Sequence, residues 1–403
     1  MDLRFSDEEN AFRQHLRDFF RTEIPTSIRT KVMENRHLEK DELVASHKIL
    51  HGKGLAVPHW PKQWGGADWS PMQQYIYTEE LQYNGVPQPL PFNVSMCGPV
   101  IIAFGTDEQK HKFLPRMAAL DDWWCQGFSE PGAGSDLAGL KTTAVRQGEH
   151  YIVNGQKTWT TSAQYADWIF CLCRTDPAAK KQQLGISFIL IDMKSPGITV
   201  RPIQTLDGGR EVNEVFLDDV KVPIENLVGQ EHRGWDCAKF LLGNERSGIA
   251  RVGYSKQRVQ RIKELAARVP AGDRPLLEDE RFREKLAAIE VELKALEMTQ
   301  MRVLSEERHS KTNKPNPASS ILKIKGSEIQ QATTALLLEV AGPLALPYRP
   351  DAEDPEFGAN EPADDQDWAA PAAPGYFNYR KVSIYGGSNE IQRNIIAKAV
   401  LGF

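Results

Sequence analysis

The chain has 403 residues, with 49 Lys and Arg against 54 Asp and Glu, which gives a formal net charge of −5. This mildly acidic balance argues against nucleic acid as the main partner, because phosphate binding needs a basic surface. No apolar run approaches the ~20 residues that span a bilayer, so we expect no stable membrane association. The acidic N-terminus lacks the pattern of a secretory signal or a transit peptide. The five cysteines lack zinc-ligand spacing, which favours reduced thiols, no metal site and a cytoplasmic location.

The first third of the chain is predicted to be helical. Ser6 followed by Glu9 is a capping-box start, and apolar residues recur at helical spacing until Pro25 ends the helix. Further helices are expected over residues 41–50, 72–83 and 107–114, the last with Thr106 as its cap.

Short β-branched and aromatic runs follow from residue 141 to about residue 228. The pattern predicts strands over residues 168–174, 186–193, 198–203 and 213–222. Asn154-Gly155 is a two-residue hairpin signal of the type I′ kind. Strand runs spaced this regularly suggest a compact β-barrel or sandwich of about 100 residues.

Helices are predicted again after Gly229. Long helical periodicity covers residues 240–256, 279–308 and 317–340, whereas residues 347–374 are rich in Pro, Asp and Ala and are expected to form an exposed loop. The order of elements predicts an α+β multidomain protein with a helical domain, a β domain and a second helical domain.

A glycine-rich run, PGAGSDLAG at residues 131–139, is similar to a dinucleotide-binding fingerprint. That fingerprint needs a strand before it and a helix after it, whereas a hairpin pattern follows here. Two interpretations stay open. The run is either a plain turn or a loop whose backbone N–H groups, with Ser129 and Ser135, face a polar ligand.

Several longer runs resemble the acyl-CoA dehydrogenase family in that family's order, and together they cover essentially the whole chain. They are GTDEQKHKFLP at 105–115, WCQGFSEPGAGSDLAGLKT at 124–142, VNGQKTWTTSA at 153–163, VPIENLVG at 222–229 and SIYGGSNEIQRNIIAKAVLG at 383–402. The resemblance implies an N-terminal helical domain at residues 1–122, a middle β-barrel domain at 123–233 and a C-terminal four-helix bundle at 234–403.

The resemblance also implies an FAD flavoprotein of lipid or side-chain β-oxidation, which converts an acyl-CoA thioester to the trans-2-enoyl-CoA. The residues that match flavin contacts of the family are Gln126, Ser129, Trp159, Thr161, Gly386, Ser388 and Glu390. Ser135 matches a contact with the CoA part of the substrate, and Arg246 matches a substrate-side arginine.

The catalytic base departs from the commonest pattern of the family. Many members place a Glu directly after the Tyr of the last run, but here Tyr385 is followed by Gly386. A second branch, which includes isovaleryl, long-chain and steroid side-chain enzymes, carries its Glu on a C-terminal helix, and Glu245 matches that position. The resemblance implies that Glu245 removes the α-proton while the β-hydride passes to flavin N5, and that the Gly386 N–H serves the thioester oxygen.

Helical spacing supports Glu245 independently of the resemblance. Leu241, Glu245, Ile249 and Val252 share one helix face, so the carboxylate lies on an apolar face. Such a setting raises a carboxyl pKa and suits a general base that works near neutral pH. The alternative is an acid that is paired with Arg246 or caps a neighbouring helix.

The sites for the FAD tail also depart from the family. The chain lacks the Arg-x-x-Phe-Gly run that holds the pyrophosphate in many homo-oligomers, and LEVAGP at 338–343 replaces the usual adenine contact. Either Arg258 or Arg261 substitutes, or a second kind of subunit supplies the missing residues. We therefore expect a homo- or heterotetramer with a second acyl-CoA dehydrogenase-like subunit, in which this chain bears the base.

The resemblance further implies that electrons pass to an electron-transfer flavoprotein. Two alternatives stay open at this point. The first is a flavin oxidase or monooxygenase on the same fold, and the second is a non-catalytic subunit that completes the FAD site of a partner. The presence of Glu245 and of the flavin loop argues against the second alternative.

Overall fold

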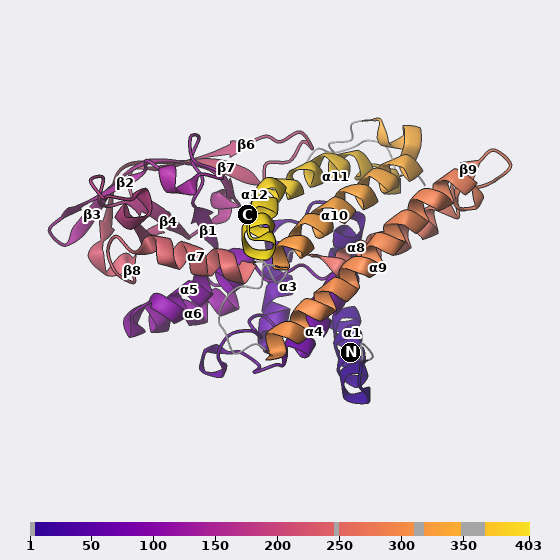
Figure 1. Ribbon diagram of the computed structural model, residues 1–403, viewed down its shortest axis with the longest axis horizontal. Coiled ribbons are helices and arrows are strands. Elements are labelled where there is room, and N and C mark those ends of the chain that lie inside the picture. Colours follow the sequence, from indigo (N-terminus) through magenta and orange to yellow (C-terminus); the bar gives the residue numbers. More distant parts are fainter. Residues whose placement is uncertain (1–4, 246–249, 310–317, 348–366) are drawn as a thin grey trace.

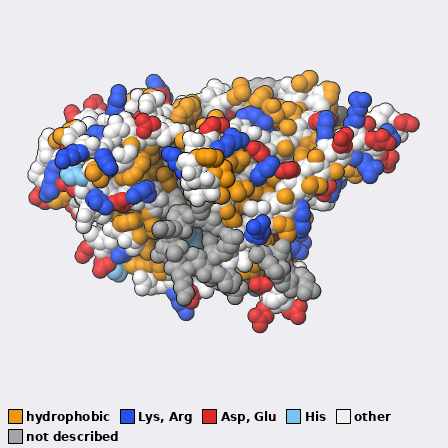
Figure 2. All heavy atoms as spheres, viewed as in Figure 1, with side chains coloured by type: hydrophobic (Ala, Val, Ile, Leu, Met, Phe, Trp, Pro, Cys, Tyr) orange, Lys and Arg blue, Asp and Glu red, His pale blue; other side chains and the backbone are white. Residues whose placement is uncertain are grey.

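The computed structural model describes residues 5–245, 250–309, 318–347 and 367–403 (Figure 1). Its helical N-terminal part, its sheet-rich middle part and its helical C-terminal part confirm the predicted fold class. In the described residues, no helix combines the length and the apolar content needed to cross a membrane. Figure 2 shows charged side chains of both signs at the end of the molecule that carries β9 (Pro270–Ala271) and β10 (Arg274–Pro275).

The N-terminal helices begin where the sequence places their caps. The Ser6 hydroxyl accepts from the Glu9 N–H at 3.2 Å, and the Glu9 carboxylate accepts from the Ser6 N–H at 2.9 Å, so the capping box is confirmed. Thr106 caps its helix in the same way. These helices are α1 (Asp7–Glu23), α2 (Thr26–Glu34), α3 (Lys40–Gly52), α4 (Pro71–Tyr83), α5 (Gly98–Phe104) and α6 (Asp107–Ala119), with a 3-10 turn at Lys62–Trp64 and a π-helix at Phe92–Cys97.

The middle part is one eight-stranded sheet. Its strands are β1 (Trp124–Gly127), β2 (Thr143–Gln147), β3 (His150–Thr161), β4 (Trp168–Arg174), β5 (Ile186–Asp192), β6 (Ile198–Ile203), β7 (Val212–Pro223) and β8 (Leu227–Val228). They run in the order β6-β7-β3-β2-β4-β5-β8, and β1 pairs with β4 in parallel. The four predicted strands are confirmed as β4 to β7.

The hairpin predicted at Asn154-Gly155 is wrong. Gln147 of β2 pairs with His150 of β3, so the two-residue turn lies at Gly148 and Glu149, and β3 continues through Asn154 without a turn. Gly155 serves a different purpose, because a Cβ there would lie 2.4 Å from the Thr142 hydroxyl. The glycine therefore permits close packing inside the sheet and does not mark a chain reversal.

The C-terminal part contains α7 (Gly234–Glu245), α8 (Val252–Ala266), α9 (Glu280–His309), α10 (Ser319–Ala341), α11 (Ala372–Asn378) and α12 (Asn389–Ile396). The single helix predicted over residues 240–256 is wrong. Residues 246–249 lie outside the described chain, and Arg251 has a left-handed φ of 49° that no right-handed helix can contain.

Much of the loop predicted at residues 347–374 also lies outside the described chain, at residues 348–366. The rest differs from the prediction. A 3-10 turn at Asp367–Ala369 leads into α11, and Ala369 and Ala372 are buried in a small alanine-rich cluster. This end of the segment is therefore packed against α10 and is not an exposed loop.

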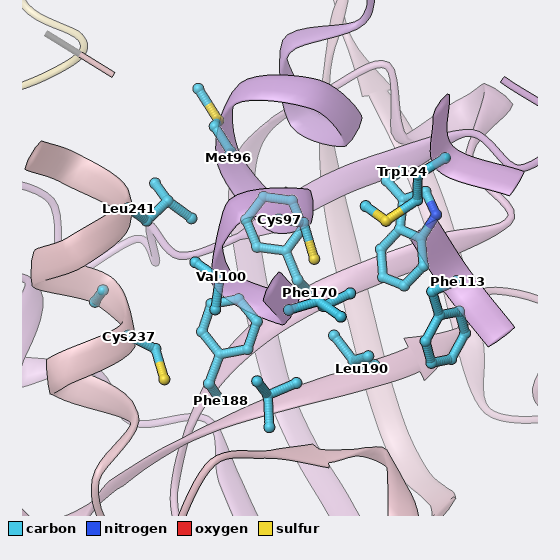
Figure 3. Close-up of a cluster of buried hydrophobic side chains, with 14 of the residues drawn as sticks. Met96, Cys97, Val100, Phe113, Trp124, Phe170, Phe188, Leu190, Cys237 and Leu241 are labelled. Atoms are coloured by element: carbon cyan, nitrogen blue, oxygen red, sulfur yellow. The ribbon is translucent and has the colours of Figure 1, made fainter. Parts of the chain in front are cut away.

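A buried cluster joins α7 to the other two parts (Figure 3). Met96, Cys97 and Val100 of the N-terminal part face the sheet, where the rings of Phe170 and Phe188 stack at 5.7 Å between centroids. The α7 side chains in the cluster are Cys237, Ala238 and Leu241. Because these residues are buried, the position of α7 is fixed against both neighbours.

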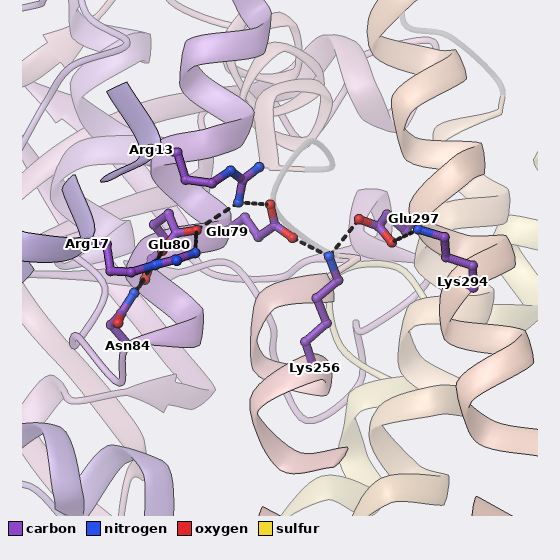
Figure 4. A network of polar contacts seen from close by, with 8 residues as sticks. All are labelled: Arg13, Arg17, Glu79, Glu80, Asn84, Lys256, Lys294 and Glu297. Atoms are coloured by element: carbon purple, nitrogen blue, oxygen red, sulfur yellow. Dashed lines mark hydrogen bonds and ion pairs between the residues drawn. The ribbon is translucent and has the colours of Figure 1, made fainter. Parts of the chain in front are cut away.

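A network of charges ties the N-terminal helices to the C-terminal ones (Figure 4). Arg13 of α1 donates to Glu79 and Glu80 of α4, each at 2.7 Å. Lys256 of α8 lies between Glu79 and Glu297 of α9 and donates to both, to Glu297 at 2.6 Å. Four helices from the two ends of the chain thus share one set of ion pairs.

Candidate active site

A cavity of about 2890 Å³ opens where the three parts meet. Its walls include side chains of α4, of the sheet, of α7, of α10 and of the loop before α12. Sites for single small ligands have volumes of roughly 300–1,000 Å³, so this cavity has room for a large cofactor together with a substrate.

The sheet side of the cavity carries Gln126 of β1 and Ser129 of the loop that follows it. The loop is held in place by Lys157 of β3. The buried ammonium of Lys157 pairs with Glu130 at 2.8 Å and donates to the Leu172 carbonyl at 2.8 Å. Burial would raise the pKa of Glu130, but the charge of Lys157 and the hydrogen bonds to the carboxylate hold it below its usual value. A buried, fully bonded pair of this kind fixes the Ser129 segment.

Trp159 points into the cavity from an irregular place in β3. The pairing of β3 with β7 shifts between Lys157 and Thr160, and Trp159 adopts a left-handed φ of 57° there. A tryptophan in this conformation is strained by about 1–3 kcal/mol, and such strain gathers at functional sites. The indole is 61% exposed, lines the cavity and lies two residues before Thr161, which lines it as well.

The loop before α12 forms the opposite wall. Gly386 and Gly387 have left-handed φ angles of 65° and 80°, and a Cβ at Gly387 would lie 2.5 Å from the Gln392 amide. Ser388 caps α12 by accepting from the Ile391 N–H at 3.4 Å. Gly386 and Ser388 line the cavity, so two residues of this predicted set come together with those of the sheet.

The other predicted residues are placed less uniformly. Ser135 is exposed and lines the cavity, with Gly134 beside it. Glu390 is exposed, lies 3.6 Å from Arg393 and is not among the cavity-lining residues. The structure therefore brings Ser135 to the cavity and leaves the Glu390 side chain in solvent.

The predicted base lies at the end of α7. Glu245 is the last residue of the helix, and Arg246 lies outside the described residues. One turn earlier Leu241 is buried, and Leu242 lines the cavity. The C-terminal end of α7 therefore reaches the cavity wall.

Sequence reasoning missed two cavity residues, Arg251 and Tyr379. A charged residue within the run GIARVG was the available signal for Arg251, but the helix predicted there concealed its conformation. Neither of the two arginines considered for the FAD pyrophosphate lines the cavity. Arg258 is buried over the Tyr379 ring at 3.9 Å from its centroid, and Arg261 pairs with Glu34 at 3.1 Å.

The described residues fit a flavin. The cavity offers an exposed indole, hydroxyl groups at Ser129 and Thr161, and a two-glycine loop in which backbone can approach a ligand closely. An aromatic surface beside a few convergent polar groups suits a flat heterocycle with polar edges.

Three family models match along the chain. The acyl-CoA dehydrogenase N-terminal domain matches residues 6–121, the middle domain matches residues 125–220 and the C-terminal domain matches residues 232–401.

Curated proteins are similar over most of the chain. Acyl-CoA dehydrogenase IpdE1 of Mycobacterium tuberculosis is 34% identical over 371 residues, which cover 91% of this chain and 89% of the relative. Acyl-CoA dehydrogenase FadE26 of the same organism is 32% identical over 415 residues, which cover 100% of this chain and 98% of the relative.

Solved structures share the architecture. A chain of the ChsE4-ChsE5 complex from Mycobacterium tuberculosis has a TM-score of 0.82 and 30% identity, over 100% of this chain and 99% of that one. A chain of the Tcur3481-Tcur3483 steroid ACAD has a TM-score of 0.84 and 28% identity, over the same shares of the two chains.

Proposed function

The chain belongs to the acyl-CoA dehydrogenase family, and from that premise we propose that it catalyses the FAD-dependent α,β-dehydrogenation of an acyl-CoA thioester to the trans-2-enoyl-CoA. The observation that carries the proposal is the convergence of Ser129, Trp159 and Gly386 on one large cavity that the end of α7 also reaches.

Residues of the sheet and of the last loop would hold the cofactor. Gln126, Ser129 and Thr161 offer hydrogen-bonding groups to the heterocycle, and Trp159 offers an aromatic surface. When bound, FAD supplies the acceptor for the β-hydride. The buried pair of Lys157 and Glu130 keeps this wall rigid, so the polar groups are in place before any ligand arrives.

Glu245 would take the α-proton. Since Gly386 has no side chain, the residue after Tyr385 cannot act as the base, and the carboxylate has to come from another element. We assign it to α7, which Cys237 and Leu241 anchor in the buried cluster. The Gly386 N–H would donate to the thioester oxygen, so that the charge that develops on removal of the α-proton meets a fixed donor.

The two substrate-side assignments follow from the same cavity. Ser135, which is exposed and lines the cavity, would contact the CoA part of the substrate, and Arg246 would lie on the substrate side of the base.

The Glu245→Gln variant tests the assignment of the base. We expect the rate of flavin bleaching by an acyl-CoA under anaerobic conditions to fall by about 10²–10⁴-fold, because a positioned base contributes that much. The flavin-to-protein ratio is expected to stay unchanged. Glu284→Gln, on the exposed face of α9, serves as the matched control. Near-normal bleaching by Glu245→Gln would rule out this base.

Assembly with a second acyl-CoA dehydrogenase-like subunit is part of the proposal. The ChsE4-ChsE5 and Tcur3481-Tcur3483 structures are complexes of two different chains. The departures at the FAD tail support a partner that supplies contacts for the pyrophosphate and the adenine. Purification with and without a base-less subunit tests this point, since we expect full flavin content only in the mixture. A fully flavinylated, active homotetramer would refute it.

The proposed electron acceptor is an electron-transfer flavoprotein. The reduced enzyme is therefore expected to react slowly with oxygen, whereas an oxidase would be reoxidised rapidly. Stopped-flow reoxidation with oxygen and with the flavoprotein separates the two activities.

A further inference from the structure

Arg251 is a cation in the cavity wall without an acidic partner among the described residues. Its guanidinium lies 5.9 Å from the centroid of the Tyr254 ring. Burial works to lower the pKa of Arg251, but the tyrosines around it, Tyr385, Tyr379 and Tyr254, hold the pKa above its ordinary value. Charged groups that lose much of their hydration in a protein are almost always paired with an opposite charge, so a half-buried arginine among tyrosines needs an explanation.

A second guanidinium lies behind the same wall. Arg258, two turns further along α8, is 6% exposed and packs over the Tyr379 ring at 3.9 Å from its centroid. Its Nη1 atom is buried and has no hydrogen-bond partner. Burial would raise the pKa of Tyr379, yet the charges of Arg258 and Arg251 lower it. Two guanidinium groups therefore act on Tyr379, against the opposing charge of Glu211.

The carboxylate whose charge acts on Tyr379 is that of Glu211, which lines the cavity and pairs with Lys381. The carboxylates of α4 and α9 are held by other cations. Glu80 of α4 receives hydrogen bonds from Arg13 at 2.7 Å and from Arg17 at 2.9 Å. Glu297 of α9 pairs with Lys256 at 2.6 Å and with Lys294 at 3.1 Å. Each of these carboxylates thus has a cation of its own, and Arg251 has no acidic partner in the part of the chain that the structure describes.

The position of Arg251 indicates which part of a substrate it faces. It begins α8 in the interior of the helical parts, where a Cβ at Gly326 of α10 would lie 2.8 Å from the Cα of Ala250. The proposed CoA contact, Ser135, is instead an exposed residue of the loop after β1. Leu81 of α4 and Leu304 of α9 line the same cavity, so its wall carries apolar side chains as well as the cation. One placed charge in such a wall acts as a specificity determinant.

We propose that Arg251, with Tyr379 and the charge of Arg258 behind it, forms an anion subsite. The acyl group of the substrate then carries an ionised carboxylate at the end away from the thioester, and that carboxylate binds there. This inference rests on the proposed function for the identity of the thioester. The planar guanidinium matches the two oxygens of a carboxylate. The charge-assisted hydrogen bonds between them would favour a dicarboxylic acyl group over one that ends in a methyl group.

Binding of two matched CoA thioethers tests the subsite without turnover. S-(6-carboxyhexyl)-CoA and S-heptyl-CoA have the same chain, lack the carbonyl and differ in the terminal carboxylate. By calorimetry on the flavin-loaded protein, we expect the carboxylated probe to bind at least about tenfold more tightly. Arg251→Gln is expected to remove that preference while the affinity for S-heptyl-CoA changes by less than about threefold.

Two further variants make the test independent of folding. Arg251→Lys keeps the charge without the planar fork, so a reduced but measurable preference is expected. Arg283→Gln, on the exposed face of α9, is expected to leave both affinities unchanged. Equal weakening of both probes by Arg251→Gln would overturn the proposal. Loss of bound flavin from Arg251→Gln, with the preference for the carboxylated probe unchanged, would also overturn the proposal, because that result assigns the cation to a cofactor phosphate.

The outcome is separable from that of the proposed function. If neither pimeloyl-CoA nor heptanoyl-CoA bleaches the flavin while the carboxylated thioether still binds preferentially, the dehydrogenase assignment fails and the subsite stands. If both bleach it with equal kcat/KM and the thioethers bind equally, the subsite fails and the dehydrogenase stands.

Discussion

Lys157 shows how one residue can hold the architecture of a site without touching its ligand. Its ammonium is fully buried on β3 and bonds Glu130, the Phe128 carbonyl and the Leu172 carbonyl. Glu130 in turn accepts from the backbone N–H groups of Lys141 and Thr142 at 2.6 and 2.9 Å. The loop that carries Ser129 is thus fastened by a network in which each member depends on the others.

Replacement of Lys157 is expected to loosen the loop that carries Ser129 on the sheet side of the cavity. Lys157→Met leaves the Glu130 carboxylate buried without its counter-ion, so we expect a loss of about 3–5 kcal/mol in the free energy of unfolding and a lower flavin-to-protein ratio. Urea unfolding and the visible absorbance measure the two effects. Lys141→Met, an exposed neighbour whose backbone bond persists, is the control. The double variant Lys157→Met with Glu130→Gln is expected to regain part of the lost free energy of unfolding. An unfolding midpoint of Lys157→Met equal to that of Lys141→Met would contradict the prediction.

Residue identities could be read from the sequence more readily than residue conformations. The resemblance pointed to Gln126, Ser129 and Trp159, and all three line the cavity. The left-handed φ of Trp159 could not be foreseen, because it depends on a pairing shift against a strand some fifty residues away, β7. Its consequence, an indole that faces the cavity, is set by tertiary pairing and not by local propensity.

At the scale of elements, caps and periodicity predicted most helices and four strands, while long-range contacts decided the exceptions. The Asn154-Gly155 signal was overridden because Gly148 takes the turn and Gly155 is needed for the approach of Thr142. The break between α7 and α8 had no local signal, since the residues around Arg251 keep helical spacing. Sequence periodicity reports which face is apolar but not where tertiary packing interrupts a helix.

The charge network among α1, α4, α8 and α9 makes stability depend on pH in a defined direction. Burial would raise the pKa of Glu80 and of Glu297, but their arginine and lysine partners hold both pKa values below the ordinary carboxyl value. A carboxyl with a lowered pKa in the folded state stabilises the protein fully above its unfolded pKa. That stabilisation is lost as the pH falls through the folded pKa. We therefore expect the contribution of this network to the urea midpoint to be constant near neutrality and to decline from roughly pH 5 downward.

Lys256→Met tests the network directly. It removes the cation between Glu79 and Glu297, so we expect a loss of about 3–5 kcal/mol at pH 7, because two buried carboxylates lose a shared partner. The acid dependence is expected to shrink, since the pKa of Glu297 rises toward its unfolded value. Lys285→Met, which breaks only the exposed pair with Glu339, is expected to cost less than about 1 kcal/mol. Equal losses in the two variants would show that burial of the network contributes nothing.

At the scale of the molecule, the C-terminal end carries exposed apolar side chains. Val400 is 56% exposed, Leu401 61% and Phe403 87%, and all three lie just after α12, which supports the last loop of the cavity. Apolar groups that gather at one place on a surface mark interaction sites. This end is therefore the surface that we expect to bury in the proposed assembly.

The double variant Leu401→Ser and Phe403→Ser is expected to weaken that assembly. Light scattering coupled to size exclusion would record a lower mass at micromolar concentration, because the apolar contacts that hold the interface are removed. Val145→Ser with Leu184→Ser, on exposed apolar residues of the sheet part, is the matched control and is expected to leave the mass unchanged. Identical masses for the two double variants would place the interface elsewhere.

The walls of the cavity come from positions as far apart as Asn35 and Gln392. A ribosome adds about 5–20 residues per second, so roughly 20–70 s separate the synthesis of the first wall from that of the last. During that interval the emerging chain carries aromatic and aliphatic surfaces that only its final residues will cover. We therefore expect the cavity to be completed, and a cofactor to bind, only after the last of its walls has been synthesised.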